Sequence, residues 1–160
     1  MNQEQNQITT PVPCYTVTIL GEKLPQVLTI PGRLPGLNEY TDKCRTNPRA
    51  GNQMKRDAQE TVMWHILSQL RRVKFERPVF LLYRYYEKDK RRDKDNVSGF
   101  AHKVIQDALV AAGTLEDDGW KHVTGSLDQY YVDSKNPRIV VEFIEEVGAC
   151  SKQPGKSSKK

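Results

Sequence analysis

The stretch VFLLYRYY (residues 79–86) leads, three residues later, into the charged run KRRDKDN (residues 90–96). The first segment is rich in β-branched and aromatic residues and follows Pro78, which predicts a strand. Asn96 is a favourable helix N-cap, and the residues after it predict an amphipathic helix that Gly113 ends. Its apolar positions are Val97, Phe100, Ala101, Val104, Ile105, Ala108, Leu109 and Ala112. The charged run is therefore expected where a buried strand passes into a helix.

The remaining segments predict a small α/β protein. Apolar residues at helical spacing predict another helix over residues 53–70. Strands are expected at 27–30, about 121–132 and 139–144, and the Pro- and Gly-rich stretch 33–49 is expected to be a loop. The predicted order is β-α-β-α-β-β: a two-layer sandwich with two helices on a mixed, mainly antiparallel sheet, its last two strands forming a hairpin.

Composition places one domain between two polar ends. Residues 1–13 are Gln- and Asn-rich and are expected to be a disordered leader, 14–146 to be the folded domain with a first strand near 14–20, and 147–160 to be a disordered tail. The net charge is +5, and four lysines without an acid lie in the tail, which favours salt-sensitive attraction to nucleic acid or simple solubility.

Cellular location is constrained by what the sequence lacks. There is no signal peptide and no apolar run near the ~18–20 residues that span a bilayer, so no membrane partner is expected. The cysteines are Cys14, Cys44 and Cys150, an odd number with no Cys-x₂-Cys spacing, which favours a reduced, cytoplasmic protein without a structural zinc site.

The aspartates at positions 93 and 95 carry the strongest chemical signal. If the run is extended, side chains two residues apart share a face, so Asp93 and Asp95 point the same way. Two neighbouring carboxylates repel each other unless a cation lies between them, and Mg²⁺ prefers such oxygens while keeping waters for substrate phosphates. The pattern predicts an acidic metal site surrounded by basic residues. A solvated turn is the simpler interpretation, because Asp is common in turns.

A second acidic cluster, Glu116-Asp117-Asp118, follows the helix that begins near Asn96. That helix of 17 residues (96–112) spans about 25 Å. The two acidic clusters can therefore meet only if the chain after Gly113 folds back along the helix.

Together these motifs resemble one family. The run RRDKDN, a helix with KxxxDAL (Lys103 to Leu109) and then LxDD, with IPGR and LNEY upstream, resembles the RusA-like Holliday-junction resolvases over residues 26–146. The resemblance implies a homodimeric α/β endonuclease of bacteria or phages that cuts four-way DNA junctions in recombination and repair, with Mg²⁺ as cofactor.

The resemblance also implies roles for individual residues. It implies Asp93, Asp95 and Asp118 as metal ligands, with Asp117 as the alternative to Asp118, and Lys103 as the catalytic lysine. In some members this lysine follows the aspartate pair one helical turn sooner. DNA-phosphate contacts are expected from Arg33, Arg45, Arg49, Lys90, Arg91 and Arg92. The alternative function is a non-catalytic nucleic-acid-binding module, a decayed phage resolvase.

Overall fold

A computed structural model describes residues 26–145. The elements are β1 (Gln26–Pro31), α1 (Leu37–Thr46), α2 (Pro48–Gln69), β2 (Val79–Glu87), α3 (Lys94–Ala111), β3 (Val123–Val132) and β4 (Arg138–Glu145). They form an α/β fold with a mixed, mostly antiparallel sheet, which confirms the predicted class, but with three helices instead of two. The expected leader, the expected strand near 14–20 and the basic tail lie outside the described residues.

The four strands form one open sheet in the order β1-β4-β2-β3. Strand β4 pairs antiparallel with both β1 and β2, whereas β2 and β3 are parallel. The predicted hairpin of the last two strands is therefore wrong. Parallel neighbours need a crossover connection, and α3 supplies it between β2 and β3, while β4 lies between β1 and β2.

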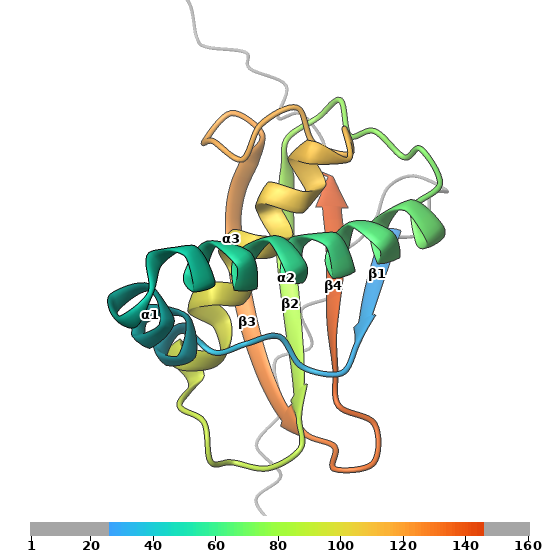
Figure 1. The fold of residues 1–160 in the computed structure, drawn as a ribbon. Helices are drawn as coiled ribbons and strands as arrows, with labels where there is room; N and C mark the ends of the chain where they lie inside the picture. The colour runs from blue at the N-terminus through green and yellow to red at the C-terminus, as the bar shows by residue number, and fades with distance from the viewer. Residues whose placement is uncertain (1–25, 146–160) are drawn as a thin grey trace, which may run out of the picture.

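The helices lie on the same face of the sheet (Figure 1). Helix α2 runs across the strands, and α3 runs along them, close to β2 and β3 (Figure 1). Strand β2 alternates between buried and half-buried residues, so Val79, Leu81, Tyr83 and Tyr85 face the helices. The apolar stripe of α3 is buried as predicted, at Val97, Phe100, Ala101, Val104, Ile105, Ala108 and Leu109.

Helix α1 lies where the sequence predicted a loop. None of its residues is fully buried, but Tyr40 is half-buried and packs on Phe100 of α3, with ring centroids 4.8 Å apart. Its N-terminus is capped from α3, because Oδ1 of Asn96 accepts a hydrogen bond from the Asn38 N–H at 2.8 Å. A Cβ atom at Gly36 would lie 2.6 Å from that oxygen, which explains glycine there. Asn96 thus caps α1, and the N-cap of α3 is Asp93.

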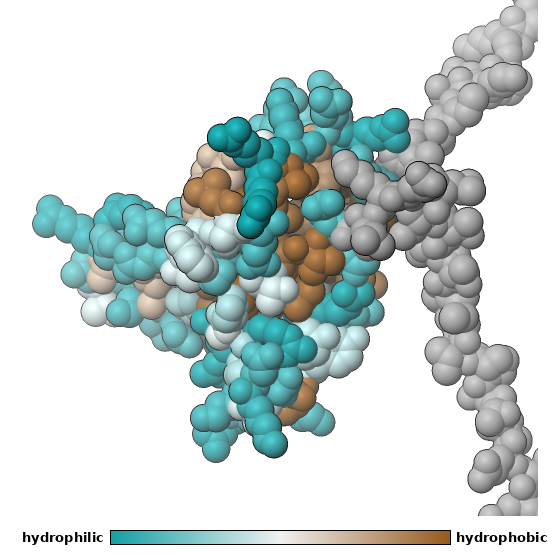
Figure 2. All heavy atoms as spheres, turned by 90° about the vertical axis from the view of Figure 1, so that its right-hand side faces the viewer, coloured by the Kyte–Doolittle hydropathy of each residue, from teal (hydrophilic) through white to brown (hydrophobic). Residues whose placement is uncertain are grey.

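Helix α2 begins five residues before its predicted start. Pro48 occupies the first turn, where its missing N–H costs nothing, and Oδ1 of Asn47 accepts hydrogen bonds from the N–H groups of Arg49 and Ala50. Within residues 26–145, no helix is long and apolar enough to cross a membrane. Seen from the β1 side, hydrophobic residues gather in the middle of the surface and hydrophilic residues surround them (Figure 2).

Candidate metal and nucleic-acid site

The predicted aspartates lie at the N-terminus of α3. Asp93 is the N-cap residue, with φ −63° and ψ 150°, and its side chain makes no capping hydrogen bond. Asp95 lies in the first helical turn. The expectation of an extended segment through both residues is therefore wrong, because the helix begins at Lys94, two residues before the predicted cap. Negative charge at a helix N-terminus is stabilising, which gives both aspartates a structural role without a metal.

A cavity of about 970 Å³ nevertheless brings both aspartates together with cations. It lies between the end of β2, the first turn of α3 and the end of β3. The residues that line it are Glu87, Asp89, Lys90, Arg92, Asp93, Lys94, Asp95, Val97, Tyr130, Tyr131 and Val132. This is the combination of acidic and basic groups that the sequence predicted around residues 90–95. We call it the α3 cavity.

Lys103 and Asp118 form a second polar group, further along α3. Nζ of Lys103 lies 2.7 Å from Oδ1 of Asp107 and 3.5 Å from Oδ2 of Asp118. Nζ of Lys55, on α2, lies 2.8 Å from Oδ2 of Asp107. The chain after Gly113 thus folds back far enough for Asp118 to reach Lys103, and the half-buried Asp118, not the exposed Asp117, makes this contact.

The charges in this second group reinforce one another. The hydrogen bond to Asp107 raises the pKa of Lys103, and the charge of Asp118 raises it further. Burial raises the pKa of Asp107, but hydrogen bonds from Lys103 and Lys55 outweigh burial, so the net shift is downward. Lys103 therefore stays protonated at neutral pH, as a residue that stabilises phosphoryl charge must.

The structure does not join the two groups into one metal centre. Lys103 follows Asp95 by eight residues, which is about 12 Å along a helix axis. In the part of the chain that the structure describes, no three His, Cys, Asp or Glu side chains lie close enough together to hold a metal ion. Asp118 is placed beside the predicted lysine but is not seen beside Asp93 or Asp95.

The six predicted DNA-contacting cations divide into two kinds. Arg45 and Arg49 are exposed at the junction of α1 and α2, and Lys90 and Arg91 are exposed in the loop after β2. Arg33 and Arg92 instead pair with the buried carboxylate of Glu87: the shortest N–O distances are 3.5 Å for Arg33 and 2.6 Å for Arg92. The first four are exposed and can meet a phosphate backbone, although Nε of Arg91 lies 3.8 Å from Oδ2 of Asp89, whereas Arg92 is held by Glu87.

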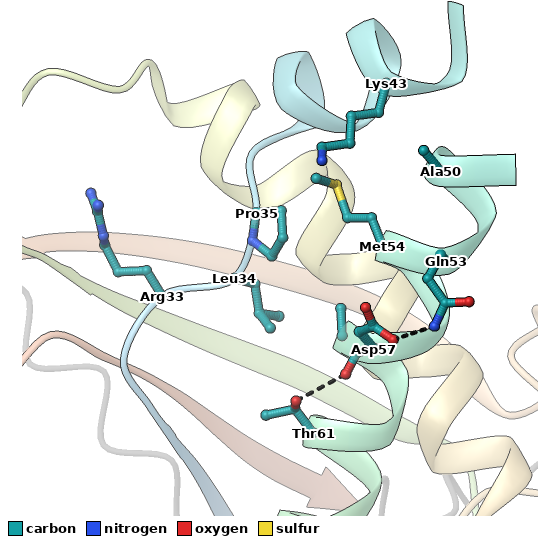
Figure 3. A pocket seen from close by; sticks show the side chains of 10 residues that line it. Arg33, Leu34, Pro35, Lys43, Ala50, Gln53, Met54, Asp57 and Thr61 are labelled. Atoms are coloured by element: carbon teal, nitrogen blue, oxygen red, sulfur yellow. Dashed lines mark hydrogen bonds between the residues drawn. The ribbon is translucent and has the colours of Figure 1, made fainter. Parts of the chain in front are cut away.

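A smaller cavity of about 490 Å³ lies between residues 33–35, α1 and α2. Lys43 reaches toward it from α1, while the side chain of Arg33 points away from Asp57 (Figure 3). Asp57 accepts a 2.6 Å hydrogen bond from Nε2 of Gln53 (Figure 3). Its lining combines one acid, two cations, two uncharged polar residues and apolar side chains, a mixture that identifies no particular ligand.

Beneath α3 lies a cluster that sequence reasoning did not assemble. Nε2 of His102 lies 2.8 Å from Oδ1 of Asp128, and the hydroxyl of Tyr130 donates to Oδ2 of Asp128 at 3.2 Å. The ring of His102 packs on Tyr83 with centroids 4.4 Å apart. The sequence does indicate that Asp128 and Tyr130, two residues apart in β3, lie on the same face of that strand. It does not show their contact with His102, because that contact depends on how β3 pairs with β2.

Comparison with known proteins does not identify a family for this chain. A scan against models of protein families finds no match to this chain, and a search of curated proteins finds none either. The functional assignment therefore depends on the side chains of the α3 cavity and the motifs that surround them.

Proposed function

We propose that this protein is a Mg²⁺-dependent endonuclease that resolves Holliday junctions and related branched DNA in recombination and repair. The observation that supports the proposal best is the α3 cavity, where Asp93 and Asp95 lie among Lys90, Arg92 and Lys94. Carboxylate oxygens suit a hard cation, and the cations around them suit a phosphodiester. The resemblance to RusA-like resolvases supplies the substrate class.

Each residue has a stated role in this proposal. Asp93 and Asp95 would hold Mg²⁺, and the resemblance implies Asp118 as the third ligand, although the structure places Asp118 beside Lys103 and not beside this pair. A metal bound there would supply a polarised water for in-line attack and charge stabilisation for the leaving 3′-oxygen. The protonated Lys103 stabilises the charge that develops on the phosphoryl oxygens. The exposed cations Arg45, Arg49, Lys90 and Arg91 hold neighbouring backbone phosphates, whereas Arg33 and Arg92 pair with Glu87.

The second candidate function is a binding module without catalysis. One observation favours it: the N-terminus of α3 accounts for both aspartates structurally. A synthetic immobile four-way junction separates the candidates. The endonuclease is expected to cut it at paired symmetric positions in Mg²⁺ and not in EDTA. Binding under both conditions with cleavage under neither would support the binding module.

A homodimer is the expected working form, since two coordinated cuts on a two-fold symmetric junction need two active sites related by the same symmetry. Sedimentation equilibrium of the full chain at micromolar concentration is expected to give twice the mass of 18.4 kDa. The same measurement with junction DNA is expected to give one dimer per junction. A monomer in both samples would exclude this form.

We also propose a cytoplasmic location. Cys44, in α1, is a free thiol, as expected in a reducing compartment. A cytoplasmic protein has direct access to chromosomal or phage DNA, which agrees with the proposed substrate.

A further inference from the structure

Two aromatic rings and a guanidinium group form a stacked row across three strands. Tyr86 of β2 is opposite Arg138 of β4 on one side and opposite Tyr131 of β3 on the other. The guanidinium carbon of Arg138 lies 3.7 Å from the centroid of the Tyr86 ring. The rings of Tyr86 and Tyr131 stack with centroids 5.0 Å apart and planes 20° apart. Tyr85 faces the helices, so this row lies on the opposite face of the sheet, which none of the helices in Figure 1 covers.

The row ends at Tyr131 with an exposed ring. Strand β3 is an edge strand of the sheet that residues 26–145 form, so no described strand lies beyond it. Tyr131 remains 44% exposed although one side of its ring packs on Tyr86. Aromatic rings favour offset stacking on other flat rings. The outer side of Tyr131 therefore offers a position for one more ring at the end of the row.

Hydrogen bonds hold the Tyr131 ring in place. Its hydroxyl donates to Oε1 of Gln129 at 3.0 Å, and Nε of Arg84 donates to the same oxygen at 3.2 Å. Arg84 in turn pairs with Glu142 of β4, with an N–O distance of 2.8 Å. A side chain that is already fixed loses little conformational entropy when a ligand packs on it, so the ring is suited to binding.

The exposed ring adjoins the α3 cavity. Tyr131 is one of the residues that line this cavity, together with the exposed cations Lys90 and Lys94 and the aspartates Asp93 and Asp95. Proteins that bind single-stranded nucleic acid combine aromatic side chains for the bases with cations for the backbone. A nucleotide carries both a flat base and a phosphate, and this end of β3 offers a partner for each.

We propose that Tyr131 stacks on an unpaired nucleobase of the DNA strand whose phosphates enter the α3 cavity. The choice of DNA rests on the proposed function. Every base has a π face, so stacking tolerates any sequence. Bases within an intact duplex are stacked on one another and show a protein only their edges in the grooves. The site therefore favours branch points, where pairing is interrupted, over continuous duplex.

Binding of single-stranded DNA to the full chain in EDTA tests this assignment without cleavage. The two probes are an oligothymidylate of about 12 nucleotides, which is within the range of single-strand site sizes, and an abasic strand of the same length, which keeps the phosphates and lacks the bases. Fluorescence anisotropy measures both affinities. Tyr131→Leu is expected to weaken binding of the oligothymidylate about tenfold and binding of the abasic strand less than about twofold.

Two matched variants separate stacking from other effects of the substitution. Tyr131→Phe keeps the ring and loses only the hydrogen bond to Gln129, so its affinity for the oligothymidylate is expected to stay within about threefold of wild type. Leu127→Ala removes an apolar side chain of β3 that is 52% exposed and is expected to leave both affinities within about twofold. Thermal unfolding confirms that each variant is folded. Equal losses for the two probes in Tyr131→Leu would show that the ring does not contact a base.

The outcomes separate this inference from the proposed function, which depends on cleavage in Mg²⁺. If the wild type cuts a four-way junction but Tyr131→Leu binds the oligothymidylate as the wild type does, the inference fails and the endonuclease proposal stands. If the base-dependent loss is found but no junction is cut, the inference stands and the endonuclease proposal fails. If Tyr131→Leu changes the mass in sedimentation and leaves DNA affinity unchanged, the ring belongs to an interface between subunits and the inference is wrong.

Discussion

Replacing Asp95 with Asn is expected to reduce cleavage of a four-way junction by roughly a hundredfold or more in Mg²⁺. The substitution keeps the size of the side chain but removes a negative charge from the α3 cavity, which weakens the hold on the metal. Asp93→Asn is expected to have an effect of the same kind. Rates under single-turnover conditions, with saturating protein, isolate this loss from any change in DNA affinity.

Binding of the junction is expected to survive or become tighter in both variants. The phosphate-contacting cations are unchanged, and one negative charge that repels DNA is removed. A gel-shift or anisotropy titration in Ca²⁺ or EDTA measures this binding. Asp89→Asn is the matched control, since Asp89 lines the same cavity and is not a predicted ligand; its cleavage rate is expected to stay within a few-fold of wild type.

If Asp93 and Asp95 only stabilise the N-terminus of α3, a different result is expected. Asn is as good an N-cap as Asp, and loss of one charge in the first turn of a helix costs about 0.3–1 kcal/mol. Cleavage would then fall only in proportion to the folded fraction, which thermal unfolding reports. Wild-type cleavage rates in both Asp93→Asn and Asp95→Asn would show that neither residue holds the metal.

The parts of the fold with strong local periodicity could be predicted from the sequence. Strand β2 and helix α3 each bury a regular set of apolar residues, and both were expected within a few residues of their bounds. Helix α1 was missed because Pro35-Gly36 and Pro48 at its two ends favoured a loop. The pairing of β3 with β2 was missed because strand neighbours are decided by contacts between distant segments, and two strands joined by a short turn equally suit a hairpin.

The residues of the candidate site also divide into those that the sequence brings together and those that only the fold brings together. Lys90, Arg92, Asp93 and Asp95 are close in sequence, so any compact junction between a strand and a helix brings them together. Lys103 and Asp118 also meet, which the sequence alone left open. The cluster around Asp128 joins β3 to α3, so its existence depends on sheet register and helix placement at once.

Among the predicted DNA contacts, Arg92 is expected to contribute mainly to stability. Its guanidinium makes hydrogen bonds of 2.6 and 3.2 Å to Glu87 and one of 3.0 Å to the carbonyl oxygen of Leu34. Glu87 is only 8% exposed. Removing one partner of such a pair leaves a buried charge, so Arg92→Met is expected to lower the free energy of unfolding by about 3 kcal/mol. Arg33, 3.5 Å from the same carboxylate, limits the loss.

Urea unfolding of a double-mutant cycle measures this directly. Adding Glu87→Gln to Arg92→Met is expected to recover part of the lost stability, because the uncompensated charge is then gone. Arg91→Met is the matched control: the Arg91 side chain is 90% exposed, so its effect on stability is expected to stay within about 0.5 kcal/mol. Arg91→Met is instead expected to reduce the salt dependence of junction binding by about one phosphate contact. If Arg92→Met leaves the unfolding free energy unchanged and lowers DNA affinity as Arg91→Met does, then Arg92 is a phosphate contact and not a support for Glu87.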